Sequence, residues 1–218
     1  MSTSKNVSLR VHDWAFIPRV PFEIGRMAES VVFVHHTPEQ PKVRVTMRAG
    51  QPPGIQLGPG TRDAEEVLSD FFDGEPDEGA RWALVFEAGY RFEWPENTAL
   101  WSTDDSVNWA VELTIAGGPL DQMLYVQGPF LASHAPSLEA LIGPGMEAVG
   151  RMNLDGSAGV IQAIELAYQH EGQPWRQWRY LVPIGPEQVV LITAQTDAEG
   201  YAAMLALGQA VATQLHAA

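Results

Sequence analysis

The sequence predicts an α+β fold, in which a mostly antiparallel, twisted sheet carries two or three helices. Apolar and polar residues alternate with a period of two through much of the chain, which is typical of half-buried strands. Five Gly-Pro dipeptides separate these segments, and each indicates a turn because proline can neither continue a helix nor donate to a strand ladder. A chain of 218 residues fits one domain over 1–218, with 117–128 as the candidate boundary if there are two.

Strands are expected along most of the chain. The first two, 30–35 and 42–48, are joined by a proline-containing linker that predicts a hairpin. Further strands are expected at 81–93, 107–115 and 122–127. Three more follow in close succession at 160–169, 175–182 and 188–195, and the short connections between them suit antiparallel turns.

Three segments have apolar residues at helical spacing. They are 63–72, 137–142 with a continuation over 146–152, and 197–216. Ser137 and Asp197 carry side chains that are preferred at helix N-caps, so they predict where the second and third helices begin. The last helix is expected to close the three-strand meander that precedes it.

The composition excludes several classes of partner and site. With 27 acidic and 13 basic residues the net charge is −14, so nucleic acid and anionic membrane surfaces are both repelled. The chain has no cysteine, which rules out disulfides, thiolate catalysis and cysteine-bound metals. The first residues lack the apolar core of a signal peptide, and no apolar run is long enough to span a membrane, so we expect a cytoplasmic protein.

None of the local motifs predicts a catalytic residue, a cofactor or a metal. The glycine-rich segments 54–60 and 143–145 lack the Gly-Lys-Ser/Thr sequence that a phosphate loop requires. Segment 155–159 resembles the nucleophile elbow G-x-S-x-G, but Asp155 stands where that motif has its first glycine. The acids of 73–77 are spaced as in a calcium loop, whereas the glycine and the terminal glutamate of such a loop are missing.

The first candidate binding surface is an acidic segment. Residues 63–78 contain eight acidic residues and no basic one. Because summed negative charge attracts a basic partner and speeds its encounter, we expect partner contacts at Glu66, Asp70, Asp73 and Asp77. The alternative is that these acids complement a helix dipole and keep a turn soluble.

Tryptophans supply the second candidate surface. The chain contains seven, and strand alternation places Trp178 on one face with Arg176, Tyr180 and Val182. We expect Trp175 and Trp178 to line a groove that receives a partner helix or an apolar ligand. The alternative is that they are core residues.

The end of the chain resembles a known family. An apolar strand, Gln188-Val-Val-Leu-Ile-Thr-Ala194, leads into a closing helix with Tyr201 and Leu205, and the strand before it contains Trp178-Arg-Tyr180. Together with the order strand–helix–strand–strand–strand–helix from about residue 120, this resembles the PsbP-like fold. That group includes photosystem II extrinsic subunits and small bacterial adaptors or chaperones for type VI secretion effectors. The resemblance implies a binding or assembly protein and supplies no catalytic residue.

We therefore expect a non-catalytic interaction protein of a bacterial cytoplasm, as an adaptor, a chaperone or an immunity-type partner. It would bind another protein through a basic surface or an apolar helix of that partner, and a homo-oligomer is a further option. The alternative is an enzyme or small-ligand-binding protein with a site assembled from dispersed residues. The candidates for such a site are His35, His36, His134, His170, Glu93 and Asp104.

Overall fold

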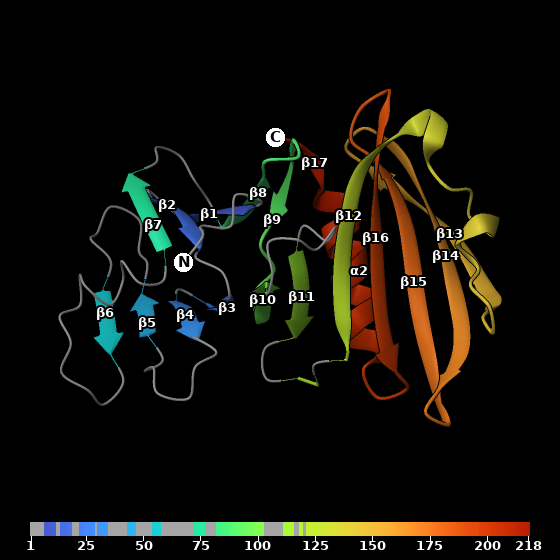
Figure 1. Ribbon diagram of the computed structural model, residues 1–218, viewed down its shortest axis with the longest axis horizontal. Coiled ribbons are helices and arrows are strands. Elements are labelled where there is room, and N and C mark those ends of the chain that lie inside the picture. The colour runs from blue at the N-terminus through green and yellow to red at the C-terminus, as the bar shows by residue number, and fades with distance from the viewer. Residues whose placement is uncertain are drawn as a thin grey trace.

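The computed structural model describes 7–11, 14–18, 22–28, 30–34, 43–46, 54–57, 72–76, 82–102, 111–115, 118–119 and 121–218. These residues form two antiparallel sheets and one α-helix, α2 (Tyr201–Gln214). Two single 3-10 turns, η1 (Ala132–His134) and η2 (Glu139–Leu141), complete the described secondary structure. The fold is therefore mostly antiparallel β, and the prediction of an α+β protein with two or three packed helices is wrong (Figure 1).

The larger sheet has eleven strands in the order β13-β14-β15-β16-β12-β11-β10-β3-β4-β5-β6. Their bounds are β3 (Phe22–Met27), β4 (Ser30–Val34), β5 (Val43–Thr46), β6 (Gly54–Leu57), β10 (Thr98–Ser102), β11 (Val111–Ile115), β12 (Met123–Leu131), β13 (Glu147–Gly156), β14 (Gly159–His170), β15 (Gln173–Pro183) and β16 (Gln188–Asp197). The predicted hairpin of the first two expected strands is confirmed as β4 and β5, and the predicted meander as β14, β15 and β16.

The smaller sheet has six strands in the order β17-β9-β8-β1-β2-β7. Their bounds are β1 (Val7–Val11), β2 (Trp14–Pro18), β7 (Phe72–Pro76), β8 (Ala83–Phe86), β9 (Tyr90–Glu93) and β17 (His216–Ala217). The prediction of one long strand over 81–93 is wrong, because β8 and β9 form a hairpin there. Gly89 makes this turn possible, since its φ of 91° lies in the region that residues with a side chain rarely adopt.

The first two helix predictions have different outcomes. Residues 63–71 lie outside the described part of the chain, and Phe72 begins β7. The prediction that a helix continues over 146–152 is wrong, because residues 147–152 belong to β13. Ser137 does accept a hydrogen bond from the Ala140 N–H at 3.2 Å, as a cap would, but Gly143 and Pro144 follow and only the single turn η2 forms.

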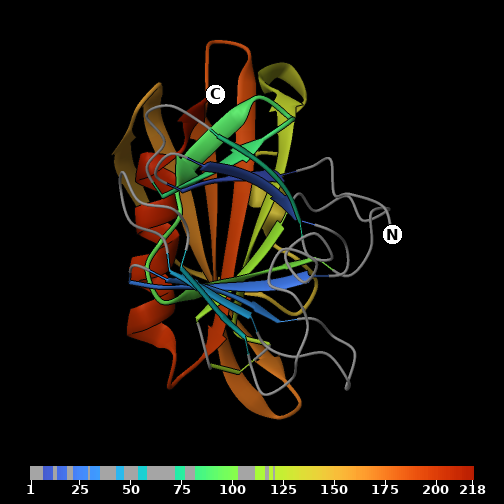
Figure 2. The same ribbon diagram turned by 90° about the vertical axis from the view of Figure 1, so that its left-hand side faces the viewer.

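The closing helix is confirmed, but it starts later than Asp197. One carboxylate oxygen of Asp197, Oδ1, accepts hydrogen bonds from the backbone N–H groups of Glu199 and Gly200 and from the Gln122 side chain, each at 3.0 Å. Asp197 thus orders the turn that leads into α2, while Gly200 is the residue at the N-cap. Figures 1 and 2 show α2 lying along one face of the larger sheet, where it packs on β15 and β16.

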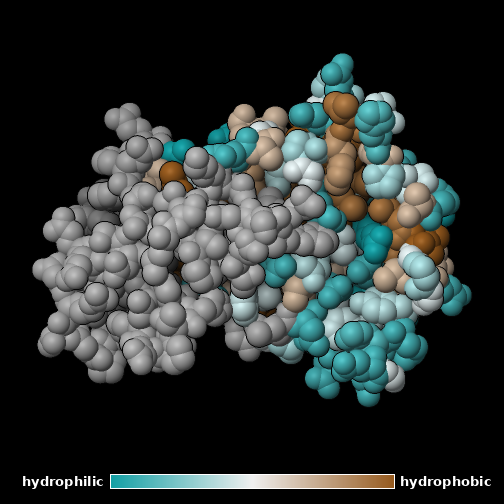
Figure 3. Space-filling view, in the orientation of Figure 1, coloured by the Kyte–Doolittle hydropathy of each residue, from teal (hydrophilic) through white to brown (hydrophobic). Residues whose placement is uncertain are grey.

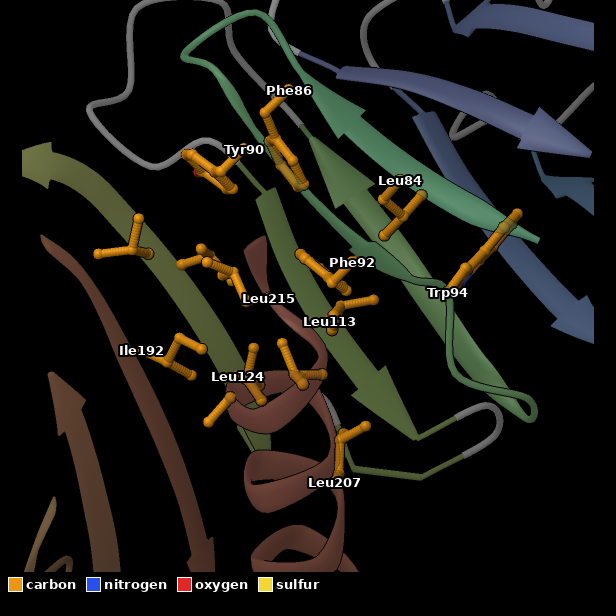
Figure 4. Close-up of a cluster of buried hydrophobic side chains, with 14 of the residues drawn as sticks. Leu84, Phe86, Tyr90, Phe92, Trp94, Leu113, Leu124, Ile192, Leu207 and Leu215 are labelled. Atoms are coloured by element: carbon orange, nitrogen blue, oxygen red, sulfur yellow. The ribbon is translucent and has the colours of Figure 1, made fainter. Parts of the chain in front are cut away.

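The main core lies where the two sheets and α2 meet. In Figure 4, Phe86, Tyr90 and Phe92 of the smaller sheet face buried residues of the larger sheet and of the end of α2. Phe86 and Tyr90 stack with their ring centroids 4.5 Å apart. One cluster of buried side chains therefore joins both sheets to the helix.

A buried arginine also connects the two sheets. Arg26 of β3 donates a hydrogen bond to the Trp94 carbonyl just after β9. Its guanidinium lies 4.7 Å from the centroid of the Trp82 ring, which precedes β8.

The strands next to the candidate boundary at 117–128 belong to the same sheet. β11 pairs with β12 from Thr114–Met123 to Val111–Val126.

Candidate functional site

The face of the larger sheet opposite α2 carries the candidate site, and we call it the loop face because η1 and η2 lie over it (Figures 1 and 2). Strand alternation divides β15 between the two faces. Trp178, Tyr180 and Val182 belong to the main core on the α2 side, as the predicted alternation requires. The residues of β15 that alternate with these lie on the loop face. They are Trp175, Gln177, Arg179, Leu181 and Pro183.

A row of polar side chains fastens η2 to the loop face. Arg179 donates to the Leu141 carbonyl at 2.5 Å and to Gln177 Oε1 at 2.6 Å. Gln177 in turn donates to Gln195 Oε1 at 3.2 Å, and Gln195 donates to the Asp121 carbonyl at 3.1 Å. Burial lowers the pKa of the Arg179 guanidinium, and the nearby Tyr168 acts in the opposite direction. The middle of the loop face is thus occupied by the protein's own loop.

Burial also changes the titration of three groups beside this row. It raises the pKa of Glu112 above its ordinary value, and that of Tyr168 as well. Burial, with a smaller effect from the negative charge of Glu112, raises the pKa of Tyr125 to about 12. Burial thus shifts each of these groups toward its neutral form, and at neutral pH both tyrosines keep their hydroxyl protons.

A hollow of about 350 Å³ lies at one end of the loop face, and we call it the acidic hollow. Its lining residues are Asp121, His170, Glu171, Gln173, Pro174, Trp175, Asp197, Ala198 and Glu199. Trp175 is only 5% exposed and its ring meets that of His170 edge-on, with centroids 5.4 Å apart. Four carboxylates and no lysine or arginine stand among the described residues that line it, so its chemistry favours a cation.

A second hollow, of about 420 Å³, lies at the other end of the same face, and we call it the apolar hollow. Its apolar lining comes from Ala132, Ala135, Pro136, Leu138, Val160, Leu181, Pro183 and Val189. Val160 is 56% exposed, and the adjacent Leu131 is 53% exposed. Figure 3 shows hydrophobic residues gathered toward the upper part of this face and hydrophilic residues at its lower end.

An ion pair closes one side of the apolar hollow. Arg151 of β13 lies 2.8 Å from Glu139 Oε1 of η2, and both side chains are more than half exposed. The hydrogen bond from Arg151 lowers the pKa of Glu139. Solvent screens such a pair, so it positions η2 more than it stabilises the fold.

The structure separates the predicted site residues. Trp175 lines the acidic hollow, whereas Trp178 is fully buried and packs edge-on against Tyr201, with ring centroids 4.9 Å apart. Asp73 lies in β7, opposite Ile17 of β2. Glu66, Asp70, Asp77 and the side chain of Asp73 are outside the described residues.

The dispersed residues of the alternative site are not brought together where they are described. His134 lies in η1 beside the apolar hollow, and His170 lines the acidic hollow at the far end of the face. Glu93 lies 4.0 Å from Arg26 at the junction of the two sheets. The other three candidates, His35, His36 and Asp104, are outside the described residues.

Sequence reasoning missed most of the acidic hollow. Asp121, Glu171 and Glu199 come from three connections that are separated by 50 and 28 positions in the chain. No local motif contains them. The available signal was indirect, since two predicted turns with acidic residues, 170–174 and the start of the last helix, flank strands that were predicted to be neighbours.

Among the described residues, no group of three or more histidine or carboxylate side chains is arranged to hold a metal ion. No described helix is both long and apolar enough to cross a membrane. No protein-family model matches the chain, and no protein of curated function matches it significantly in sequence. The fold and the site thus define a mostly antiparallel β protein with two chemically different hollows on one face.

Proposed function

We propose that this chain is a non-catalytic interaction protein that binds a basic segment of another protein in the acidic hollow. The observation that carries the proposal is the position of Trp175 among the carboxylates of Asp121, Glu171, Asp197 and Glu199 in one hollow. A lysine or arginine side chain fits this chemistry, because an indole ring attracts a cation and the surrounding carboxylates accept its hydrogen bonds.

The carboxylates of the hollow have different roles. Asp197 Oδ1 already accepts three hydrogen bonds from its own chain, so it is held rigidly in place. Glu171 and Glu199 are exposed and make no hydrogen bond through their side chains in the described structure, which leaves them available to a partner. A cation can therefore bind to one carboxylate that is already fixed and to two that are free to turn toward it. Such binding requires no movement of the backbone, which lowers its cost.

A finer form of the proposal follows from the PsbP-like resemblance. In that form the chain is an adaptor or chaperone of a bacterial cytoplasm that binds a secretion effector, and the partner's basic segment belongs to that effector. An immunity-type partner of a basic toxin domain is the other form, and it would use the same charge complementarity.

The apolar hollow supports a second mode of partner binding. Val160 and Leu131 expose apolar side chains beside a hollow with a largely apolar lining, which suits an apolar face of a partner helix. Binding there would depend little on salt, whereas binding in the acidic hollow would weaken as salt rises, since the Debye length falls from about 10 Å at 0.1 M to about 3 Å at 1 M.

The test uses a synthetic peptide of alternating arginine and serine as the probe, with the same peptide carrying glutamine for arginine as its blank. Isothermal titration would compare the native chain with the double variant Glu171→Gln/Glu199→Gln and with a control of equal charge, Glu147→Gln/Glu187→Gln, whose acids are exposed away from the hollow. We expect the hollow variant to bind the arginine peptide at least about 10-fold more weakly, and the control to bind like the native chain.

Equal losses in the two double variants would mean that only net charge matters, and the proposal would then fail. Binding of the glutamine peptide as tightly as the arginine peptide would contradict it as well. Because Trp175 lines the hollow, its fluorescence should also change when the arginine peptide binds, and Trp175→Phe should remove that change.

A further inference from the structure

The larger sheet ends in a long strand with a free edge. β13 is the terminal strand of that sheet, and in the described structure it pairs only with β14. It contains ten residues, and six of them are exposed. An unpaired strand edge of this length is a template for another strand.

The direction of the backbone groups on this edge follows from the β13–β14 turn. Gly156 and Gly159 close a two-residue hairpin loop, so they form a hydrogen-bonded pair. Hydrogen-bonded and non-hydrogen-bonded pairs then alternate along an antiparallel ladder. The backbone N–H and C=O groups of Arg151, Asn153 and Asp155 therefore point away from β14, toward the free edge.

The usable part of the edge is limited by a β-bulge. The β13–β14 register shifts between Ala148 and Gly150, so Val149 interrupts the ladder and is 47% exposed. From Gly150 to Gly156 the register is regular. A partner strand can thus pair with a straight segment of seven residues, 150–156.

The charges of this segment are self-complementary in one register. If a second copy of β13 pairs antiparallel around Asn153, Arg151 of each chain faces Asp155 of the other, which gives two opposite-charge pairs. A register centred on Arg151 would place two arginines opposite each other and Glu147 opposite Asp155. A register centred on Val149 would put the bulge in the middle of the interface.

We propose that a second copy of this chain docks on the β13 edge in the register centred on Asn153. The pairs Arg151–Asp155, Asn153–Asn153 and Asp155–Arg151 would exchange about six backbone hydrogen bonds across the two-fold axis. On the α2 side of the sheet, Met152 of each copy would face Leu154 of the other, and both residues already pack against the main core. Charge, hydrogen bonding and apolar contact therefore favour the same register.

The test is sedimentation of the full chain over a range of concentrations. We expect the native chain to form dimers, and each of the single variants Arg151→Asp and Asp155→Arg to dimerise about 10- to 100-fold more weakly, because both charge pairs become like-charge pairs. An equimolar mixture of the two variants should dimerise again, because each copy of one then faces opposite charges on the other. Glu139→Gln removes the intrachain partner of Arg151 without changing the edge, and it should dimerise like the native chain.

Each other result overturns the proposal. A native chain that stays monomeric up to about 1 mM, where association would be worth only about 4 kcal/mol, means that the bulge and the charges keep this edge free. A dimer that both variants leave unchanged lies elsewhere on the molecule. Variants that lose the dimer but do not regain it on mixing, while remaining folded by circular dichroism, exclude the proposed register.

Discussion

Arg179 on β15 donates a 2.5 Å hydrogen bond to the main-chain carbonyl of Leu141, a residue 38 positions earlier in η2. The side chain of Leu141 is buried beneath the same turn. One half-buried guanidinium thus holds the loop that separates the acidic hollow from the apolar hollow. The apolar hollow, which is lined in part by Leu138 and Glu139 of this loop, keeps its shape only while the loop stays on the sheet.

Arg179→Ala should therefore loosen the loop and lower the free energy of unfolding by about 1–3 kcal/mol, since it leaves a carbonyl and a glutamine without their donor. Urea unfolding measures the loss, and hydrogen exchange of 138–146 locates it. Arg151→Ala is the matched control, because it removes an exposed ion pair to the same turn and should cost less than about 1 kcal/mol. Equal costs would contradict the role of Arg179.

Gly208→Ala should destabilise the fold although alanine is the better helix former. A Cβ at this position would lie 3.0 Å from the buried Tyr180 hydroxyl and 3.2 Å from Ala194 Cβ, so α2 would have to move away from β15 and β16. Overpacking of about 1–3 kcal/mol outweighs a gain in helix propensity of about 1 kcal/mol. Thermal unfolding would report a lower melting temperature. Ala206→Gly at an exposed position of the same helix is the control for propensity alone.

Glu112→Gln should change how stability depends on pH. Burial raises the pKa of Glu112 in the folded chain, so as the pH rises above about 4.5 the unfolded chain releases this proton first. The stabilising contribution is complete below the unfolded pKa and is lost as the pH rises through the folded pKa. The variant should gain stability relative to the native chain between pH 4 and pH 7. Melting temperatures across this range test the sign, and a constant difference would refute it.

Asp197→Ala should weaken the start of α2. The substitution removes the acceptor of three hydrogen bonds, from two backbone N–H groups and from Gln122, and should cost about 1–3 kcal/mol. Asp197→Asn keeps an oxygen at Oδ1 and should retain most of that stability. Guanidinium unfolding of the three proteins makes the comparison, and an asparagine variant as unstable as the alanine variant would show that charge matters more than the acceptor.

The sequence predicted those elements whose turn signals and alternation were both strong. The meander β14–β15–β16 and the β4–β5 hairpin have apolar alternation between short connections, and they were found within one or two residues. The α2 helix was found because its apolar stripe is long, and its start was misplaced because Asp197 caps the preceding turn.

The errors have a common physical cause. The segment 146–152, which was predicted as helical, contains Met146, Val149 and Met152 at a spacing of three that mimics a helix, and tertiary pairing of β13 with β14 outweighs this local pattern. The strand over 81–93 was predicted as one because Tyr90 and Phe92 continue the apolar character of β8, while the positive φ of Gly89 reverses the chain between them. Of the candidate site, Trp175 was predicted, but the acids around it were not, because they meet only after the sheet has formed.

The order of strands in the larger sheet has a consequence for synthesis on the ribosome. β12 lies between β11 and β16, and Gln188, where β16 begins, comes 57 positions after Leu131, where β12 ends. At translation rates of about 5–20 residues per second, synthesis of β16, the second neighbour of β12, begins about 3–11 s after β12 is complete. During that interval the nascent chain exposes an open hydrogen-bonding edge beside Leu124 and Val126, and a cellular holdase that covers this edge would protect the chain at this stage.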